Sequence, residues 1–251
     1  MKVVVVIPAR YASTRLPGKL ILPEAKVSTG RYIIEHVYRN VQRARRINRV
    51  IVATDSQRIY DIVKAFGGDV EMTSELHTSG TDRIAEVASR LDAGIIINVQ
   101  GDEPEVRGVM VDQVLDTLIE DDKAVMATLA NKITDVSELT DPNVVKVVLD
   151  NYGYALYFSR SQIPYVRDRK GPVSEPGITF LRHLGIYAYR RDFLLEYSRL
   201  PASPLEYAEK LEQLRVIFNG YKIKVSITDY ASNGIDTWDD LKAFLEKYRY
   251  D

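Results

Sequence analysis

A cluster of cations and hydroxyls follows the first apolar run of the chain. Residues 3–7 lead directly into P-A-R-Y-A-S-T-R-L-P-G-K, whose polar side chains include Arg10, Ser13, Thr14, Arg15 and Lys19. Guanidinium, ammonium and hydroxyl groups together suit a polyphosphate. The chain contains neither G-x-x-x-x-G-K-[ST] nor G-x-G-x-x-G, so this is not one of the common phosphate-binding loops. The alternative is an exposed loop that is simply polar.

Two carboxylates are candidate ligands of a magnesium ion. Asp102 lies in N-V-Q-G-D-E-P, directly after an apolar run, and Asp236 lies in G-I-D-T-W-D-D-L. Mg²⁺ commonly takes one or two protein carboxylates and leaves other positions to substrate oxygens and water. Alternatively, Asp102 could cap a helix that starts near Val106. Thr237 and Asp240 fit a helix capping box, which leaves Asp236 spare.

Further candidates occur in F-S-R, R-H-L-G-I-Y and L-E-Q-L-R of the second half. Guanidinium and imidazole groups suit an anionic, hydroxyl-rich ligand such as a sugar acid. Alternatively, these residues have a structural role or are simply exposed, as is common for a His before a strand and an Arg after one. Ser79 and Thr81 in S-G-T-D-R are similarly ambiguous, since either could cap a helix.

Composition limits the class of protein. Lys plus Arg (34) nearly balances Asp plus Glu (35), which argues against bulk electrostatic binding of nucleic acid or an acidic membrane. The absence of Cys excludes disulfides, thiolate nucleophiles and Cys-type zinc sites, and the three His are too scattered for a zinc helix. Apolar runs of only strand length and the absence of a basic leader lead us to expect a cytoplasmic protein without a membrane span.

The elements that must position these side chains alternate in the first half. Strand-like apolar runs cover residues 3–7, 50–53, 69–72 and 95–99. Helical patterns cover residues 32–41, 56–66 and 79–91. Continuous apolar strands separated by helices indicate an α/β fold with a doubly wound, mostly parallel sheet. Ligands of such sheets bind beyond the carboxyl ends of the strands, where the cationic loop and Asp102 lie.

The pattern becomes β-rich after about residue 123. Strand-like runs cover 125–129, 144–149, 155–158 and 184–189. Helices are expected at about 192–198 and 204–219, followed by a strand at 222–227 and a helix from Trp238. We expect a single domain over 1–251, with a nucleotide-binding half (about 1–123), a smaller β-rich dimerisation or substrate subdomain (about 124–190) and a return to the main sheet (about 191–251).

Taken together, the motifs resemble the 3-deoxy-manno-octulosonate (Kdo) cytidylyltransferases, the CMP-Kdo synthetases of lipopolysaccharide biosynthesis. The resemblance runs almost end to end through I-P-A-R-Y-A-S-T-R-L-P-G-K, V-A-T-D, S-G-T-D-R, N-V-Q-G-D-E-P, V-K-V-V-L-D, G-Y-A-L-Y-F-S-R, L-R-H-L-G-I-Y, L-E-Q-L-R and I-D-T. The shorter A-R-x-x-S-x-R and Q-x-D patterns also fit CMP-sialic acid synthetases, whereas F-S-R, R-H-L-G-I-Y and L-E-Q-L-R favour Kdo. The resemblance implies a nucleotide-diphospho-sugar transferase-like fold and a homodimer.

The resemblance also implies a role for each candidate residue. The CTP triphosphate would be bound by Arg10, Ser13, Arg15 and Lys19. The cytosine and ribose would be surrounded by Ala53, Thr54, Asp55, Ser79 and Gln100. Mg²⁺ would be ligated by Asp102 and Asp236, which with Arg10 and Lys19 form the catalytic set. The sugar acid would be contacted by Arg83, Arg160, Arg167, His183, Tyr187, Glu212 and Gln213.

The implied reaction converts CTP and Kdo to CMP-Kdo and diphosphate. The anomeric 2-hydroxyl attacks the α-phosphorus with the assistance of Mg²⁺, while Arg10 and Lys19 stabilise the leaving diphosphate. Alternatives are the same chemistry on 8-amino-Kdo or a sialic-type acid, and a non-catalytic nucleotide-binding protein of the same fold. A nicotinamide oxidoreductase is disfavoured because the glycine fingerprint is missing.

Two segments depart from the family pattern. Members usually continue from Gly-Lys into Pro-Leu and a short loop that ends in Gly-Lys-Pro. Here residues 20–32 form a segment a few residues longer that ends in Gly30-Arg31-Tyr32, and we expect closure over the triphosphate to differ. Trp238 stands where a helix-starting Pro is common. Because Asp236 is kept, we expect metal binding to be kept as well.

Overall fold

The chain divides into two compact units. The structure, a computed structural model, describes residues 1–12, 15–77, 79–167 and 178–249. Unit 1 consists of Met1–Asp112, Arg190–Ser198 and Ala231–Asp251, and unit 2 of Gln113–Tyr189 and Arg199–Tyr230. The change of pattern expected near residue 123 therefore lies close to the start of unit 2. No helix in the described part of the chain combines the length and apolar character needed to cross a membrane.

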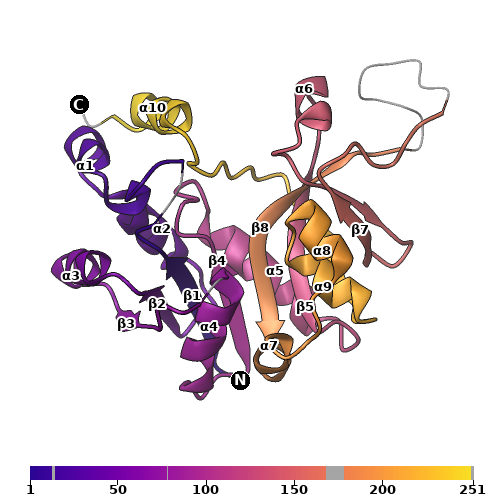
Figure 1. Cartoon of the computed structure of the whole chain (residues 1–251), viewed down its shortest axis with the longest axis horizontal. Coiled ribbons are helices and arrows are strands. Elements are labelled where there is room, and N and C mark those ends of the chain that lie inside the picture. The colour runs from indigo at the N-terminus through magenta and orange to yellow at the C-terminus, as the bar shows by residue number, and fades with distance from the viewer. Residues whose placement is uncertain (13–14, 78, 168–177, 250–251) are drawn as a thin grey trace. The chain divides into compact units, whose positions relative to one another are not determined.

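Parallel strands form the core of unit 1 (Figure 1). They lie in the order β3 (Val70–Met72), β2 (Arg49–Thr54), β1 (Val3–Ala9) and β4 (Ile95–Val99), and every pair is parallel. All residues of β1 and β4 are buried, as continuous apolar runs predict for strands covered on both faces. The α/β prediction with a mainly parallel sheet in the first half is confirmed.

Helices surround these strands, and all of them except α1 correspond to helices expected from the sequence. They are α1 (Pro23–Thr29), α2 (Ile33–Val41), α3 (Gln57–Ala65), α4 (Gly80–Ser89), α7 (Arg191–Tyr197) and α10 (Trp238–Lys247). Helix α2 buries Ile33, Ile34, Val37 and Val41, a stripe of helical spacing.

The atypical segment at residues 20–32 contains local structure that the sequence analysis missed. A 3₁₀ helix, η1 (Lys19–Ile21), is followed by α1. Pro23 opens α1, and Gly30 ends it with a left-handed φ of 75°. Pro inside the start and Gly just past the end are recognised helix signals, so the sequence did carry the information.

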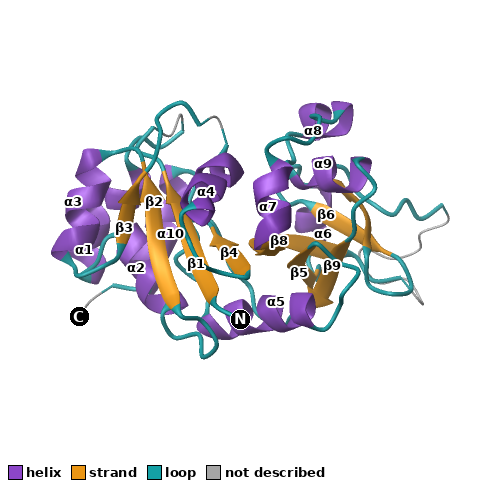
Figure 2. Cartoon of the chain, turned by 90° about the horizontal axis from the view of Figure 1, so that it is seen from below, coloured by secondary structure: helices purple, strands orange, loops and turns teal. Residues whose placement is uncertain are grey.

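Unit 2 is β-rich, as predicted (Figure 2). Its strands are β5 (Met126–Lys132), β6 (Lys146–Leu149), β7 (Ala155–Ser159), β8 (Leu181–Arg190) and β9 (Ile223–Ile227). β5 pairs antiparallel with β8 and parallel with β9, and β6 pairs antiparallel with both β7 and β8. The remaining helices are α5 (Gly108–Ile119), α6 (Val136–Thr140), α8 (Pro204–Glu209) and α9 (Gln213–Phe218).

The helical pattern predicted over residues 204–219 is wrong as a single helix. Helix α8 ends at Glu209 because Lys210 adopts a left-handed conformation with φ 54° and ψ 45°. Helix α9 begins only at Gln213. The break contains neither Gly nor Pro, the usual signals of a helix end, so the apolar periodicity continued across it.

Candidate active site

The two carboxylates predicted as metal ligands converge on one ammonium group in unit 1. Lys19 Nζ donates to Asp102 Oδ2 at 2.5 Å and to Asp236 Oδ1 at 2.8 Å. It also donates to the carbonyl oxygen of Ile235 at 2.7 Å, so all three N–H groups are used. Lys19 and Asp236 are 217 positions apart in sequence, so only the fold reveals this cluster.

Cations and carboxylates lie next to one another in this cluster. Burial lowers the pKa of Lys19, but Asp102 and Asp236 outweigh that effect and the pKa is raised. The ammonium group is therefore charged at neutral pH. Arg15 Nη2 contacts the other oxygen of Asp236 at 2.8 Å, and Arg10 follows β1 in a partly exposed position. The predicted Ser13 lies outside the described residues.

Local backbone structure positions Lys19 and Asp102. Gly18, directly before Lys19, has a left-handed φ of 68°, a conformation that favours glycine. A Cβ atom at Gly101 would lie 2.9 Å from the carbonyl oxygen of Pro8, so the chain passes β1 too closely for a side chain. Helix α5 starts at Gly108 and the Asp102 carboxylate contacts Lys19, so Asp102 is not the cap of that helix.

Asp236 is positioned by the start of α10. The predicted capping box is confirmed: Thr237 Oγ1 accepts from the Asp240 N–H, and the Asp240 carboxylate accepts from the Thr237 N–H. The Ile235 N–H donates to the Asp102 carbonyl oxygen at 2.9 Å, which joins the two carboxylate-bearing segments through their backbones.

The residues predicted to surround cytosine and ribose lie at the carboxyl ends of the unit 1 strands or beside them. Ala53 and Thr54 are the last residues of β2, and Gln100 follows β4. Ser79 caps α4 by accepting from the Asp82 N–H at 3.0 Å, which confirms the structural alternative for this residue. Capping does not test nucleotide contact, so that role stays a prediction.

Arg83 is held inside unit 1. Its side chain is fully buried and donates to Asp55 Oδ2 at 2.5 Å and to Thr73 Oγ1. Its Nε atom is buried, and no hydrogen-bond partner for it is found among the described residues. The other residues predicted to contact the sugar acid, Arg160, Arg167, His183, Tyr187, Glu212 and Gln213, belong to unit 2.

Arg160, at the end of β7, is fixed by a network that the sequence analysis missed. Its backbone N–H donates to Glu209 Oε2 at 2.9 Å, and its Nε donates to the Glu209 carbonyl oxygen at 2.7 Å. Lys146 Nζ donates to the Arg160 carbonyl oxygen at 2.7 Å and to the carbonyl oxygens of Asp141 and Val144. Burial lowers the pKa of Lys146. The one available signal was a lysine inside the apolar run V-K-V-V-L.

His183 is buried on β8. Its Nε2 lies 3.0 Å from Thr128 Oγ1, and the rings of Phe158 and Tyr187 have centroids 4.9 Å and 5.3 Å from the imidazole. Burial lowers the pKa of His183 to about 3. The imidazole is therefore neutral at physiological pH, so His183 can offer hydrogen bonds but no positive charge to an anionic ligand.

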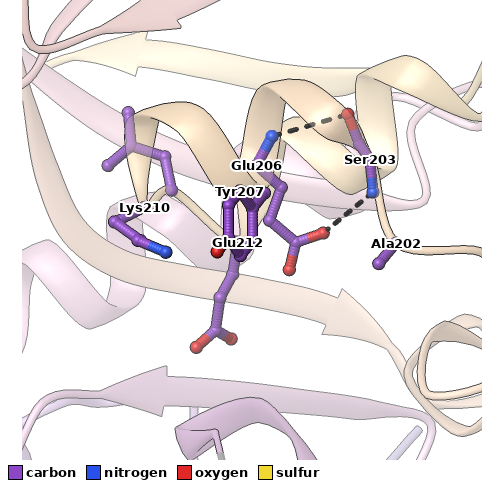
Figure 3. Close-up of a pocket in the computed structure, with 7 residues that line it drawn as sticks. Ala202, Ser203, Glu206, Tyr207, Lys210 and Glu212 are labelled. Carbon is purple, nitrogen blue, oxygen red and sulfur yellow. Dashed lines mark hydrogen bonds between the residues drawn. The ribbon is translucent and has the colours of Figure 1, made fainter.

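Of the last three residues predicted in unit 2, Glu212 and Gln213 lie at the connection between α8 and α9. Glu212 lines a pocket of about 300 Å³ together with Ala202, Ser203, Glu206, Tyr207, Lys210 and Leu211. Figure 3 shows the Glu212 carboxylate directed away from the Ser203–Glu206 capping pair. Gln213 is buried at the start of α9, and Arg167 is exposed. Their contact with a sugar acid stays a prediction.

Acidification is expected to destabilise the protein through His183. The unfolded chain binds a proton as the pH falls below 6.5, whereas folded His183 remains unprotonated until the pH approaches 3. The free energy of unfolding is therefore expected to fall by about 2 kcal/mol between pH 7 and pH 5 because of this residue. Urea denaturation at both pH values measures it. His183→Gln should show a correspondingly smaller pH dependence, and an unchanged pH dependence would contradict the assignment.

Comparison with known proteins identifies the family. Residues 4–223 match the cytidylyltransferase family. The 3-deoxy-manno-octulosonate cytidylyltransferase of Geotalea uraniireducens is 48% identical, over 99% of this chain and 100% of the relative. That of Geobacter sulfurreducens is 47% identical, also over 99% and 100%. The chain belongs to the 3-deoxy-manno-octulosonate cytidylyltransferase family.

A solved structure is also similar to this chain as a whole. The structure of a CMP:2-keto-3-deoxy-manno-octonic acid synthetase complexed with CTP matches with a TM-score of 0.90 and 43% identity, over 98% of both chains. The family resemblance and the α/β fold predicted from the sequence are therefore confirmed.

Proposed function

We propose that this protein transfers the cytidylyl group of CTP to Kdo and releases diphosphate. The observation that carries the proposal is the convergence of Asp102, Asp236 and Lys19 in a chain that aligns end to end with Kdo cytidylyltransferases. The same chemistry on a sialic-type acid is not favoured, because curated relatives at 48% identity are named for the Kdo reaction.

The reaction needs positioning and charge compensation rather than a covalent intermediate. The anomeric 2-hydroxyl oxygen of Kdo forms a bond to the α-phosphorus of CTP and loses its proton to water. The bond from that phosphorus to the bridging oxygen breaks, and diphosphate leaves with the electron pair. Arg10, Arg15 and Lys19 are the cations of unit 1 that compensate charge on the leaving group. Two arginines of unit 2, Arg160 and Arg167, bind the sugar carboxylate.

We include Mg²⁺ in the proposal because the residues present suit it. Oxygens of Asp102 and Asp236 already converge on a single cation, the Lys19 ammonium group. Two carboxylates are a number that Mg²⁺ commonly takes from a protein. Asp102 and Asp236 would hold the ion, which when bound would neutralise charge on phosphate oxygens and favour ionisation of the attacking hydroxyl.

We also propose that the protein is a cytoplasmic homodimer. The support for a dimer is a set of exposed apolar side chains in unit 2, among them Tyr152, Leu156 and Tyr165 at 74%, 57% and 83% exposure. Exposed large apolar side chains are a feature of surfaces that bind another protein chain. Light scattering of the purified protein should give twice the chain mass, and a monomer mass would contradict the dimer. The cytoplasm supplies CTP, and cell fractionation tests the location.

Diphosphate release tests the proposed reaction. Purified protein with CTP, Mg²⁺ and Kdo should release one diphosphate for each CMP-Kdo formed, and omission of the sugar should abolish the release. Parallel reactions contain 8-amino-Kdo and N-acetylneuraminate. Faster turnover of either alternative would contradict the choice of Kdo. CTP binding without turnover of any of the three acids would instead indicate a non-catalytic nucleotide-binding protein.

A further inference from the structure

An irregularity in the β5–β8 pairing brings three groups to the Thr128 hydroxyl. Thr128 lies opposite Tyr187, but Leu129 lies opposite Leu184, so residues 185–186 of β8 have no partner in the ladder. Such a bulge turns side chains and backbone groups in new directions. The carbonyl oxygens of Leu184 and Ile186 both contact Thr128 Oγ1, at 3.1 Å and 2.7 Å.

The third group at the Thr128 hydroxyl is the imidazole of His183, and its proton can be assigned by counting donors. A hydroxyl has one proton, and carbonyl oxygens only accept, so Thr128 donates to Leu184 or, more closely, to Ile186. Its contact with His183 Nε2 at 3.0 Å then uses an oxygen lone pair, so Nε2 carries the proton. In the reverse arrangement both carbonyl oxygens would face hydroxyl lone pairs, which is unfavourable for buried acceptors.

We propose that Thr128 is a positioning residue that fixes the tautomer of His183 and thereby presents Nδ1 as a hydrogen-bond acceptor to the sugar acid. The inference rests on the proposed function for its ligand. The neutral Nδ1 atom accepts a hydrogen bond from a hydroxyl group of the sugar. The carboxylate of the sugar is bound by Arg160 and Arg167 instead. His183 thus contributes to specificity by recognising a donor.

The surroundings of the imidazole support this assignment. No acidic side chain in the described part of the chain forms a hydrogen bond or ion pair with His183, and burial is what lowers its pKa to about 3. Phe158 meets the ring at an interplanar angle of 75° and Tyr187 at 43°, so the plane of the imidazole is fixed by packing as well. Among the described residues, no hydrogen bond to Nδ1 is found.

Nitrogen-15 NMR of the unliganded protein tests the tautomer without any substrate. The His183 signals are identified by their absence in His183→Asn. In the wild type at pH 7, Nε2 should carry the proton and Nδ1 should show the shift of an unprotonated nitrogen. Thr128→Val, which keeps the side-chain shape but lacks the hydroxyl, should give a mixture of tautomers. Thr128→Ser should restore the wild-type signals.

A control variant separates this effect from the loss of a threonine hydroxyl elsewhere in unit 2. Thr117 in α5 donates to the Gln113 carbonyl oxygen at 2.7 Å and has no contact with His183. Thr117→Val should therefore leave the His183 signals unchanged. A proton on Nδ1 or an imidazolium in the wild type at pH 7 would overturn the inference, and this observation does not require that Thr128→Val folds.

Kinetics provide a second readout. Thr128→Val should raise the KM for Kdo roughly tenfold and leave the KM for CTP unchanged, since one hydrogen bond is weakened. Thr128→Ser should retain the wild-type KM. Equal changes in both KM values, or a shifted tautomer with no change in the KM for Kdo, would overturn the positioning role. If the wild type shows the expected tautomer but no turnover with Kdo, the proposed function fails while the assignment of the proton stands.

Discussion

Asp102→Asn and Asp236→Asn are each expected to lower the rate of diphosphate release from CTP and Kdo at least about a thousandfold. Each substitution keeps the side-chain shape and removes one of the two negative charges that converge on Lys19. A single remaining carboxylate holds a divalent cation weakly. The measurement is diphosphate release at saturating CTP and Kdo over a range of Mg²⁺ concentrations.

The control for this prediction lies on the same helix start. Asp239 is the second residue of α10, and its side chain is 94% exposed with Lys242 as an ion-pair partner at 3.7 Å. Asp239→Asn should keep wild-type turnover. Both active-site variants should stay folded, because Lys19 retains its two other acceptors in each of them. Turnover within tenfold of the wild type in either active-site variant would show that the pair does not hold the catalytic metal.

Arg83→Met is expected to lower the free energy of unfolding by about 3 kcal/mol, since removal of one partner leaves the other charge of a buried pair uncompensated. The Arg83 side chain is fully buried, and its partner Asp55 is 20% exposed. The hydrogen bond to Thr73 is lost as well. Urea denaturation at pH 7 measures the change.

Arg90→Met is the comparison for Arg83. Arg90 follows the same helix and also forms ion pairs, but its side chain is 48% exposed, and pairs of that kind contribute little. Its substitution should cost less than about 1 kcal/mol. The same variants also address the sugar role predicted for Arg83. A normal free energy of unfolding with a raised KM for Kdo would show that Arg83 serves the ligand rather than the fold.

The strands of unit 1 could be predicted to within about two residues because β1, β2 and β4 contain continuous apolar runs, and the short strand β3 follows the Gly67-Gly68 pair that ends the preceding helical pattern. The strands of unit 2 were recognised in the same way. The break between α8 and α9 could not be predicted, because Lys210 adopts a left-handed conformation that its residue type does not signal. Helix α1 was missed although Pro23 and Gly30 mark its two ends.

In the candidate site, the sequence indicated which residues take part but not which of them contact one another. Motifs suggested Lys19, Asp102 and Asp236 separately, but their common contact depends on packing between distant segments. Thr128 appeared in the sequence as one residue of the apolar run V-M-A-T-L. Its role depends on the bulge in β8, and a bulge changes pairing without changing composition. The contacts of Arg160 with Lys146 and Glu209 could not be predicted either, because they depend on packing between segments that are distant in the sequence.

The discontinuity of unit 1 has a consequence for the timing of its assembly on the ribosome. Lys19 is synthesised 217 residues before Asp236, although they share one hydrogen bond in the folded protein. At about 5–20 residues per second, roughly 10–45 seconds separate the two during translation. All of unit 2 is synthesised within that interval. Throughout it, the strands of unit 1 lack the contacts of helix α10. Asp102 and Asp236 can therefore meet only after unit 2 has been synthesised, so a nascent chain that stops after residue 230 lacks Asp236 and is expected to be inactive.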